Sequence, residues 1–179
     1  MSPSSTRTSA TSRTGGAGFE LRDATSPEDL ATCRELFLEY QRGLGVSLCF
    51  QGFDAELAAL PGDYAPPRGR LLLASEFDQI MGCIALRPLG PTICEMKRLF
   101  VRPEYRARGL GRILVEAIIE EARELGYTHM RLDTIADRME RAVALYRSIG
   151  FVEIPPYRNN PVDSATFMEL DLLTPKQST

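Results

Sequence analysis

Hydrophobic positions in the first third of the chain change from a two-residue to a helical period, which predicts a strand followed by helices. Residues 19–23 alternate apolar and polar side chains, as a half-buried strand does. A helix is expected from Pro27, because Ser26 is a good N-cap and acidic residues fill the first turn. The helix should end near Gly43, and a second, short helix is expected over 53–60. The apolar side of the first helix carries Leu30, Cys33, Phe37 and Tyr40.

The middle of the chain has the pattern of three consecutive strands followed by an amphipathic helix. Residues 70–90 contain two apolar runs joined by a turn near Phe77 and Asp78, and a third strand covers about 92–102. The helix is predicted over 109–125, with Gly126 ending it. One side of this helix is apolar, with Leu110, Leu114, Ala117, Ile118 and Leu125.

The last part of the chain alternates strands and a helix. Residues 129–134 form an expected strand, and the next helix should be capped by Asp137, with Glu140 at the capping-box position, and should end at Gly150. Two final strands are expected near 151–154 and 165–172. This order of elements predicts an α+β fold, with a mixed sheet and helices on its faces.

The strand over 93–101 contains an irregularity. Cys94 and Met96 place apolar side chains at even positions, whereas Leu99 and Val101 continue the apolar face at odd positions. A shift of one residue inverts the two faces, as a β-bulge does, although the apolar Phe100 complicates the pattern. A bulge here would leave backbone donors unpaired and would splay the neighbouring strand, which opens a slot in the sheet.

Composition and charge narrow the class of protein. Of 179 residues, 44% are hydrophobic and 25% are charged, as in one soluble globular domain. The net charge of −3, without a basic stripe, argues against a nucleic-acid partner. The longest apolar run, Ile80–Leu86, is too short to cross a bilayer, so no membrane partner is expected. We expect a disordered tail over 1–18, one domain over 19–173 and a C-terminal tail over 174–179.

The cysteines and the histidine favour a reduced, metal-free protein. Four cysteines are scattered without a C-x-x-C pair, and His129 is the single histidine. Neither a zinc site nor a secreted disulfide framework fits that pattern, so a cytoplasmic location with no metal is expected.

An arginine-rich turn with two glycines precedes the helix predicted over 109–125. Glycines allow close approach of a ligand to the backbone, and the first N–H groups of a helix attract anions. The turn therefore suits a phosphate group, although a helix start with surface arginines is an equally good interpretation. Neither a Walker A string nor the third glycine of a dinucleotide fingerprint is present. The residues that define the turn are Arg106, Arg108, Gly109, Gly111 and Arg112.

The string Arg106-x-x-Gly109-x-Gly111 after "LFVRPEY", together with "ALYRSIGFVEI" at 144–154, resembles the acetyl-CoA signature of the GNAT N-acetyltransferase superfamily. The resemblance covers roughly 19–173 and implies a mostly antiparallel sheet with a splayed strand pair and helices on both faces. It also implies acetyl-CoA as the co-substrate, held through the pantetheine arm and the pyrophosphate. The implied pantetheine contacts are Leu99, Phe100 and Val101, and the implied pyrophosphate contacts are Arg106, Ala107, Arg108, Gly109, Leu110, Gly111 and Arg112.

Two residues are implied in catalysis by the same resemblance. Direct attack needs a neutral amine, whereas a lysine-like ammonium has a pKa near ~10.4, so a base is required. Glu95 matches the position of the glutamate base in the histone-modifying branch, and Tyr146 matches the general acid that protonates the departing thiolate. The alternatives are a Glu95 paired with Lys97 or Arg98, and a Tyr146 that only packs in the core. Where relatives carry an asparagine, this chain has Met139.

The same resemblance implies that the acceptor lies between residues 40–53 and the loop over 155–161. Tyr157, Arg158 and Asn159 would bind it, and a carboxylate on a small amine could pair with Arg158. The predicted function is therefore acetylation of a small metabolite or amino-acid-like amine, with no covalent enzyme intermediate. A protein or peptide amine as acceptor, and a non-catalytic acyl-CoA-binding module, remain alternatives. A homodimer is compatible with the sequence.

Overall fold

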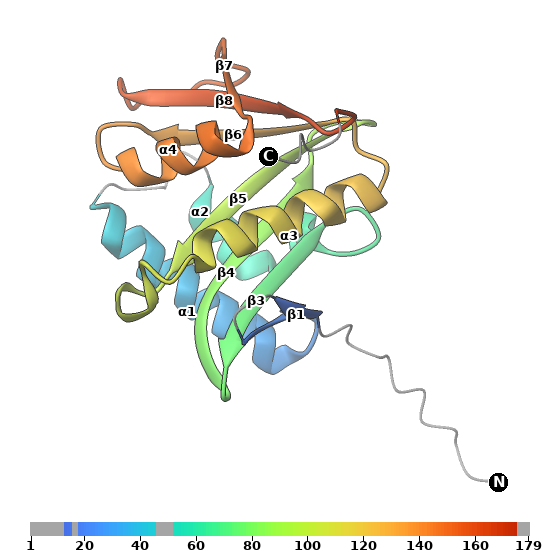
Figure 1. Ribbon diagram of the computed structural model, residues 1–179, viewed down its shortest axis with the longest axis vertical. Coiled ribbons are helices and arrows are strands. Elements are labelled where there is room, and N and C mark those ends of the chain that lie inside the picture. The colour runs from blue at the N-terminus through green and yellow to red at the C-terminus, as the bar shows by residue number, and fades with distance from the viewer. Residues whose placement is uncertain (1–12, 16–17, 46–51, 175–179) are drawn as a thin grey trace, which may run out of the picture.

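The computed structural model describes residues 13–15, 18–45 and 52–174, and these residues form one twisted sheet with helices on both faces (Figure 1). The strands of the described residues are β1 Arg13–Gly15, β2 Phe19–Asp23, β3 Arg70–Glu76, β4 Gln79–Pro88, β5 Ile93–Val101, β6 His129–Ile135, β7 Val152–Ile154 and β8 Ala165–Asp171. The helices of this part of the chain are α1 Pro27–Leu44, α2 Phe53–Ala59, α3 Leu110–Glu124 and α4 Glu140–Ile149, with 3₁₀ turns at Gly62–Tyr64 and Pro103–Tyr105.

The strand order is β1-β2-β3-β4-β5-β6-β8-β7, and β5 with β6 is the parallel pair in an otherwise antiparallel sheet. The predicted α+β fold is confirmed. Residues 13–15 pair with β2, so the disordered tail expected over 1–18 does not extend through them. The remainder of that tail, 1–12 and 16–17, lies outside the described residues, as do 175–179 of the expected C-terminal tail.

Two buried clusters, one on each face, hold the helices against the sheet. The first packs α3 and α4 on one face, through residues such as Leu114, Ile118 and Tyr146. The second packs α1 and α2 on the other, through residues such as Phe37 and Phe53. No helix in the described ranges has the length and apolar character needed to cross a membrane.

The expected bulge is present where β4 pairs with β5. The register shifts between Cys83 and Ala85, and Arg98 on β5 has a φ of 57°. Leu99 and Val101 pack against the α3 cluster, whereas Phe100 belongs to the α1 cluster, which explains its place in the apolar pattern. Gly82 permits this close pairing, because a Cβ there would lie 2.3 Å from the carbonyl oxygen of Phe100.

The start of α4 differs from the expected capping box. The helix begins at Glu140 with Met139 as its N-cap, and no side chain caps it. Asp137 lies in the preceding turn, where its Oδ1 accepts a hydrogen bond from the Ser164 hydroxyl at 2.6 Å. The carboxylate is therefore used to fix the loop before β8 instead of the helix.

Candidate active site

The sheet opens between its two parallel strands. Only Ile93–Glu95 of β5 pair with His129–Arg131 of β6, and the two strands diverge after this point (Figure 1). The bulge at Arg98, with its left-handed backbone, lies on β5 beyond this last pair. The backbone of residues 99–101 therefore has no β6 neighbour among the described residues, which suits hydrogen bonding to an extended ligand such as the pantetheine arm.

A cavity of about 40 Å³ lies in the opening. Residues from β5, β6, α1 and α4 line it: Tyr40, Met96, Lys97, Arg98, Leu99, Leu132, Asp133, Thr134, Met139 and Tyr146. Of the two residues expected in catalysis, Tyr146 lines this cavity and Glu95 does not. Burial raises the pKa of Tyr146, so its hydroxyl stays protonated and able to donate a proton through the physiological range.

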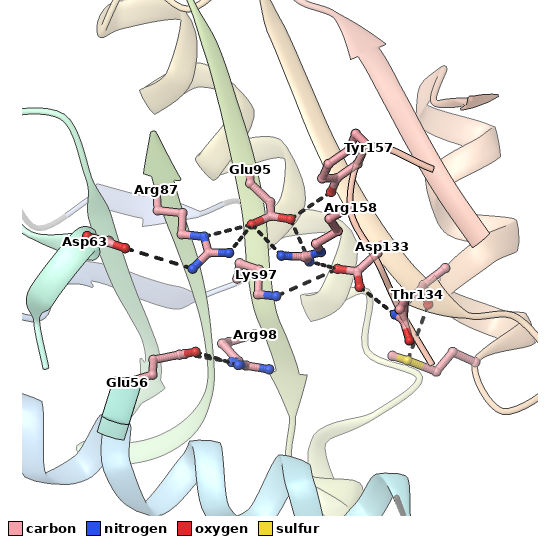
Figure 2. A network of polar contacts seen from close by, with 12 residues as sticks. Glu56, Asp63, Arg87, Glu95, Lys97, Arg98, Asp133, Thr134, Tyr157 and Arg158 are labelled. Carbon is pink, nitrogen blue, oxygen red and sulfur yellow. Dashed lines mark hydrogen bonds and ion pairs between the residues drawn. The ribbon is translucent and has the colours of Figure 1, made fainter. Parts of the chain in front are cut away.

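The carboxylate of Glu95 is fully buried and is bound by groups on three sides (Figure 2). Arg87 on β4 donates from Nε and from a terminal nitrogen at 2.8 and 2.7 Å. The Tyr157 hydroxyl donates at 2.7 Å, and Arg158 contributes a further contact at 2.7 Å. The pairing expected with Lys97 or Arg98 is thus replaced by pairing with Arg87 and Arg158. These contacts favour a positioning role for Glu95 over direct removal of a substrate proton.

A Glu95→Gln variant should lose about 3 kcal/mol of unfolding free energy, because the guanidinium of Arg87 would lose its nearest counter-charge and that of Arg158 would keep only Asp133. Urea unfolding measures this as a lower midpoint at an unchanged slope. The matched control is Glu169→Gln, because Glu169 pairs with Arg131 at 2.6 Å and its side chain is 21% exposed; this substitution should cost below about 1 kcal/mol. Equal losses in the two variants would contradict the importance given to the Glu95 contacts.

The loop between β7 and β8 is tied to both sides of the opening. Arg158 contacts Glu95 on β5 and also the carboxylate of Asp133 on β6, and Asn160 donates to Asp133 at 3.0 Å (Figure 2). Burial alone would raise the pKa of Asp133, but Lys97, Arg158 and the hydrogen bonds hold it below its ordinary value. The guanidinium expected to bind an acceptor carboxylate therefore already binds two carboxylates of the protein.

Of the three expected acceptor contacts, Tyr157 and Arg158 belong to this network and Asn159 does not. Asn159 is exposed, and the neighbouring Asn160 makes the inward contact in its place. Of the acceptor wall expected over 40–53, the structure describes residues 40–45 and 52–53. Residues 46–51 lie outside the described part of the chain.

The turn before α3 has the geometry of an anion site. Gly109 is the N-cap with φ 79°, and Ala107 is also left-handed with φ 63°. Ile113 donates its N–H to the Gly109 carbonyl, so the helical hydrogen bonds begin there and the preceding N–H groups have no intrahelical acceptor. This arrangement, with glycines at 109 and 111, fits a pyrophosphate held by main-chain donors.

The arginines of this turn contact groups within the protein. Arg108 makes a bidentate pair with Glu76 at 2.8 and 2.9 Å, and Arg112 donates to the Ser148 hydroxyl at 2.6 Å. Arg106 donates from Nε to the carbonyl of Val101 at 3.0 Å. The charge of Arg108 is thus compensated within the protein by Glu76.

Tyr40 begins the acceptor wall expected over 40–53, and it lines the cavity. Two further cavity residues carry chemistry that sequence reasoning did not assign to the site: Lys97 and Asp133. A charged residue inside an apolar strand, as in the run around Asp133, is the signal that could have found the second of them. Among the described residues no group of three His, Cys, Asp or Glu side chains could hold a metal ion.

The sheet opens between two parallel strands, with a glycine turn and a helix N-terminus beside the opening. The chain belongs to the acetyltransferase (GNAT) family, whose family model matches residues 31–151. It is 44% identical over 148 residues to an uncharacterised N-acetyltransferase of Schizosaccharomyces pombe, covering 82% of this chain and 90% of the relative.

Solved structures share the fold. An acetyltransferase from Streptococcus agalactiae aligns with a TM-score of 0.71 at 23% identity, over 87% of this chain and 99% of that one. The PaiA N-acetyltransferase from Thermoplasma acidophilum, solved in complex with coenzyme A, aligns with a TM-score of 0.67 at 20% identity, over 86% and 98% of the two chains. The recognition of the family and of an acetyl-CoA-dependent enzyme from the sequence is confirmed.

Proposed function

We propose that the protein transfers the acetyl group of acetyl-CoA to the amine of a small metabolite or amino-acid-like acceptor by direct attack. The observation that carries this proposal is the cavity between β5 and β6, where Tyr146 meets the end of the bulged strand. The main chain of residues 99–101 would hold the pantetheine arm, and the amides of residues 106–112 would hold the pyrophosphate.

Direct attack is favoured because no residue that lines the cavity in the described chain is a cysteine. Cys94 is fully buried on the core side of β5, and burial raises its pKa to about 12, so its thiol stays protonated. The amine nitrogen therefore attacks the acetyl carbonyl itself, and Tyr146 donates its proton to the sulfur as the C–S bond breaks.

A small acceptor is favoured by the closed side of the cavity. The β7–β8 loop is fastened to Glu95 and Asp133 through Tyr157, Arg158 and Asn160, so it forms a wall across the opening. The cavity beside this wall is lined by Tyr146, so the acceptor amine would meet the acetyl group there.

A screen of amines measures this function directly. The full chain is mixed with acetyl-CoA and with single amino acids, polyamines, amino sugars or short peptides, and the free thiol of CoA is followed. We expect acceptor-dependent release with at least one small amine. Release with peptides alone would assign the peptide amine as the acceptor, and CoA binding without release in any mixture would identify a non-catalytic acyl-CoA-binding module.

A further inference from the structure

The chain uses arginine for nearly all its positive charges. It contains nineteen arginines and two lysines, Lys97 and Lys176, and Lys176 lies outside the described residues. Arginine remains charged in proteins at any pH of interest, whereas lysine can release its proton when it is buried. Among the arginines and lysines of the described residues, Lys97 is thus the one that can become neutral without unfolding.

Lys97 lies in the opening of the sheet, on the wall of the cavity. It is the last residue of β5 before the bulge, and its side chain is 4% exposed and lies in the space between β5 and β6 (Figure 2). Lys97 lines the same cavity as Tyr146, with Tyr40 of α1 also on the wall. Its Nζ lies 3.8 Å from the carboxylate of Asp133 on β6.

The charges around Lys97 balance when its amine is neutral. The surrounding groups form ion pairs in which Arg87 and Arg158 contact Glu95 and Arg158 contacts Asp133, and, separately, Arg98 contacts Glu56 of α2 at 2.6 Å. These residues supply three positive and three negative charges. A protonated Lys97 adds a fourth positive charge to this set, beside the carboxylate of Asp133.

We propose that Lys97 is the group that takes the proton from the ammonium of the acceptor, a role that rests on the acetyl transfer proposed above. The neutral amine of Lys97 accepts one proton from R–NH₃⁺, and the freed nitrogen lone pair forms the C–N bond at the acetyl carbonyl. The C–S electron pair leaves with sulfur, which takes the proton of Tyr146. The second proton lost from nitrogen restores the Tyr146 hydroxyl, and Lys97 releases its proton to solvent.

The electrostatics of the site agree with this role. Burial lowers the pKa of Lys97 to about 8, with Arg98 and Arg158 acting in the same direction and Glu95 and Asp133 opposing them. The neutral fraction therefore grows as the pH rises through 8. The rate at saturating acceptor should rise through the same range and level above it.

A titration that does not need the reaction tests the first requirement. The full-length protein is labelled with ¹³C-lysine, the Lys176→Arg variant leaves one lysine signal, and its side-chain shifts are followed from pH 6 to 11. We expect a midpoint near pH 8. A midpoint near the ordinary lysine value of about 10.4 would overturn the proposal whether or not an acceptor is known.

Activity of two variants tests the second requirement. Lys97→Arg keeps a positive charge that cannot be removed, and Lys97→Met keeps the length of the side chain without a base, so both should lower kcat at least tenfold and lose the rise near pH 8. Lys176→Arg is the control and should keep the wild-type rate, and CoA binding by each variant reports folding. A folded Lys97→Arg enzyme with the wild-type pH profile would overturn the role of Lys97. Absence of acetyl transfer by the wild-type protein would refute the proposed function and the role of Lys97 with it.

Discussion

Gly109→Val should weaken CoA binding by about a hundredfold or more, which corresponds to about 2.7 kcal/mol. Gly109 has φ 79° at the start of α3, a conformation that a β-branched residue avoids. A Cβ at this position meets no atom within 4 Å, so the effect comes from the backbone and from the added side chain in front of the amides. The turn would relax toward negative φ, and the N–H groups of residues 110–112 would no longer converge on one anion. Isothermal titration calorimetry with CoA measures the change.

The other end of the same helix offers a matched control. Gly126 has φ 81°, and a Cβ there also meets no atom within 4 Å. Gly126→Val therefore imposes the same kind of backbone strain, of about 1–3 kcal/mol, far from the proposed phosphate site. It should lower the melting temperature as Gly109→Val does and keep the wild-type affinity for CoA. Equal affinities in the two variants would place the phosphates elsewhere on the protein.

Patterns that are local in the sequence predicted most of the fold. The helices and the strands followed from apolar spacing, and the bulge followed from the change of face between Met96 and Leu99. The glycines and arginines that precede the apolar pattern of α3 likewise predicted the turn before that helix. Each of these depends on residues a few positions apart, so one sequence contains the whole signal.

Contacts between distant segments were not predictable in the same way. The partners of Glu95 come from positions 87, 157 and 158, and an ion pair is decided by which side chains the folded sheet brings together. Lys97 and Arg98 are nearer to Glu95 in the sequence than these partners are. At the bulge, however, Arg98 pairs with Glu56, and Lys97 lines the cavity in the opening. The Asp137 cap was wrong for a similar reason, because Ser164 of a distant loop competes for its carboxylate.

Tyr146→Phe should lower kcat by about a hundredfold or more, with little change in the affinity for CoA. The thiolate of CoA resembles a free thiol with a pKa near ~8.5, so a proton delivered as the C–S bond breaks assists its departure. Phenylalanine keeps the ring, whose centroid lies 5.7 Å from the centroid of the Phe151 ring. The substitution therefore removes only the hydroxyl that donates the proton. Since burial raises the pKa of Tyr146, the wild-type rate should not fall between pH 8 and 10 through loss of this proton. Single-turnover release of the thiol, followed from pH 8 to 10, measures the rate of the transfer step and its dependence on pH.

Tyr127→Phe is the control for the loss of a buried phenol. Tyr127 belongs to the same apolar cluster, and its hydroxyl donates to the carbonyl of Arg68 at 2.8 Å, outside the cavity. Its removal should cost about 1 kcal/mol of unfolding free energy and leave kcat unchanged. A Tyr146→Phe enzyme that is as fast as Tyr127→Phe would assign Tyr146 to packing alone. The thiolate would then leave unassisted, which its pKa near ~8.5 permits more readily as the pH rises.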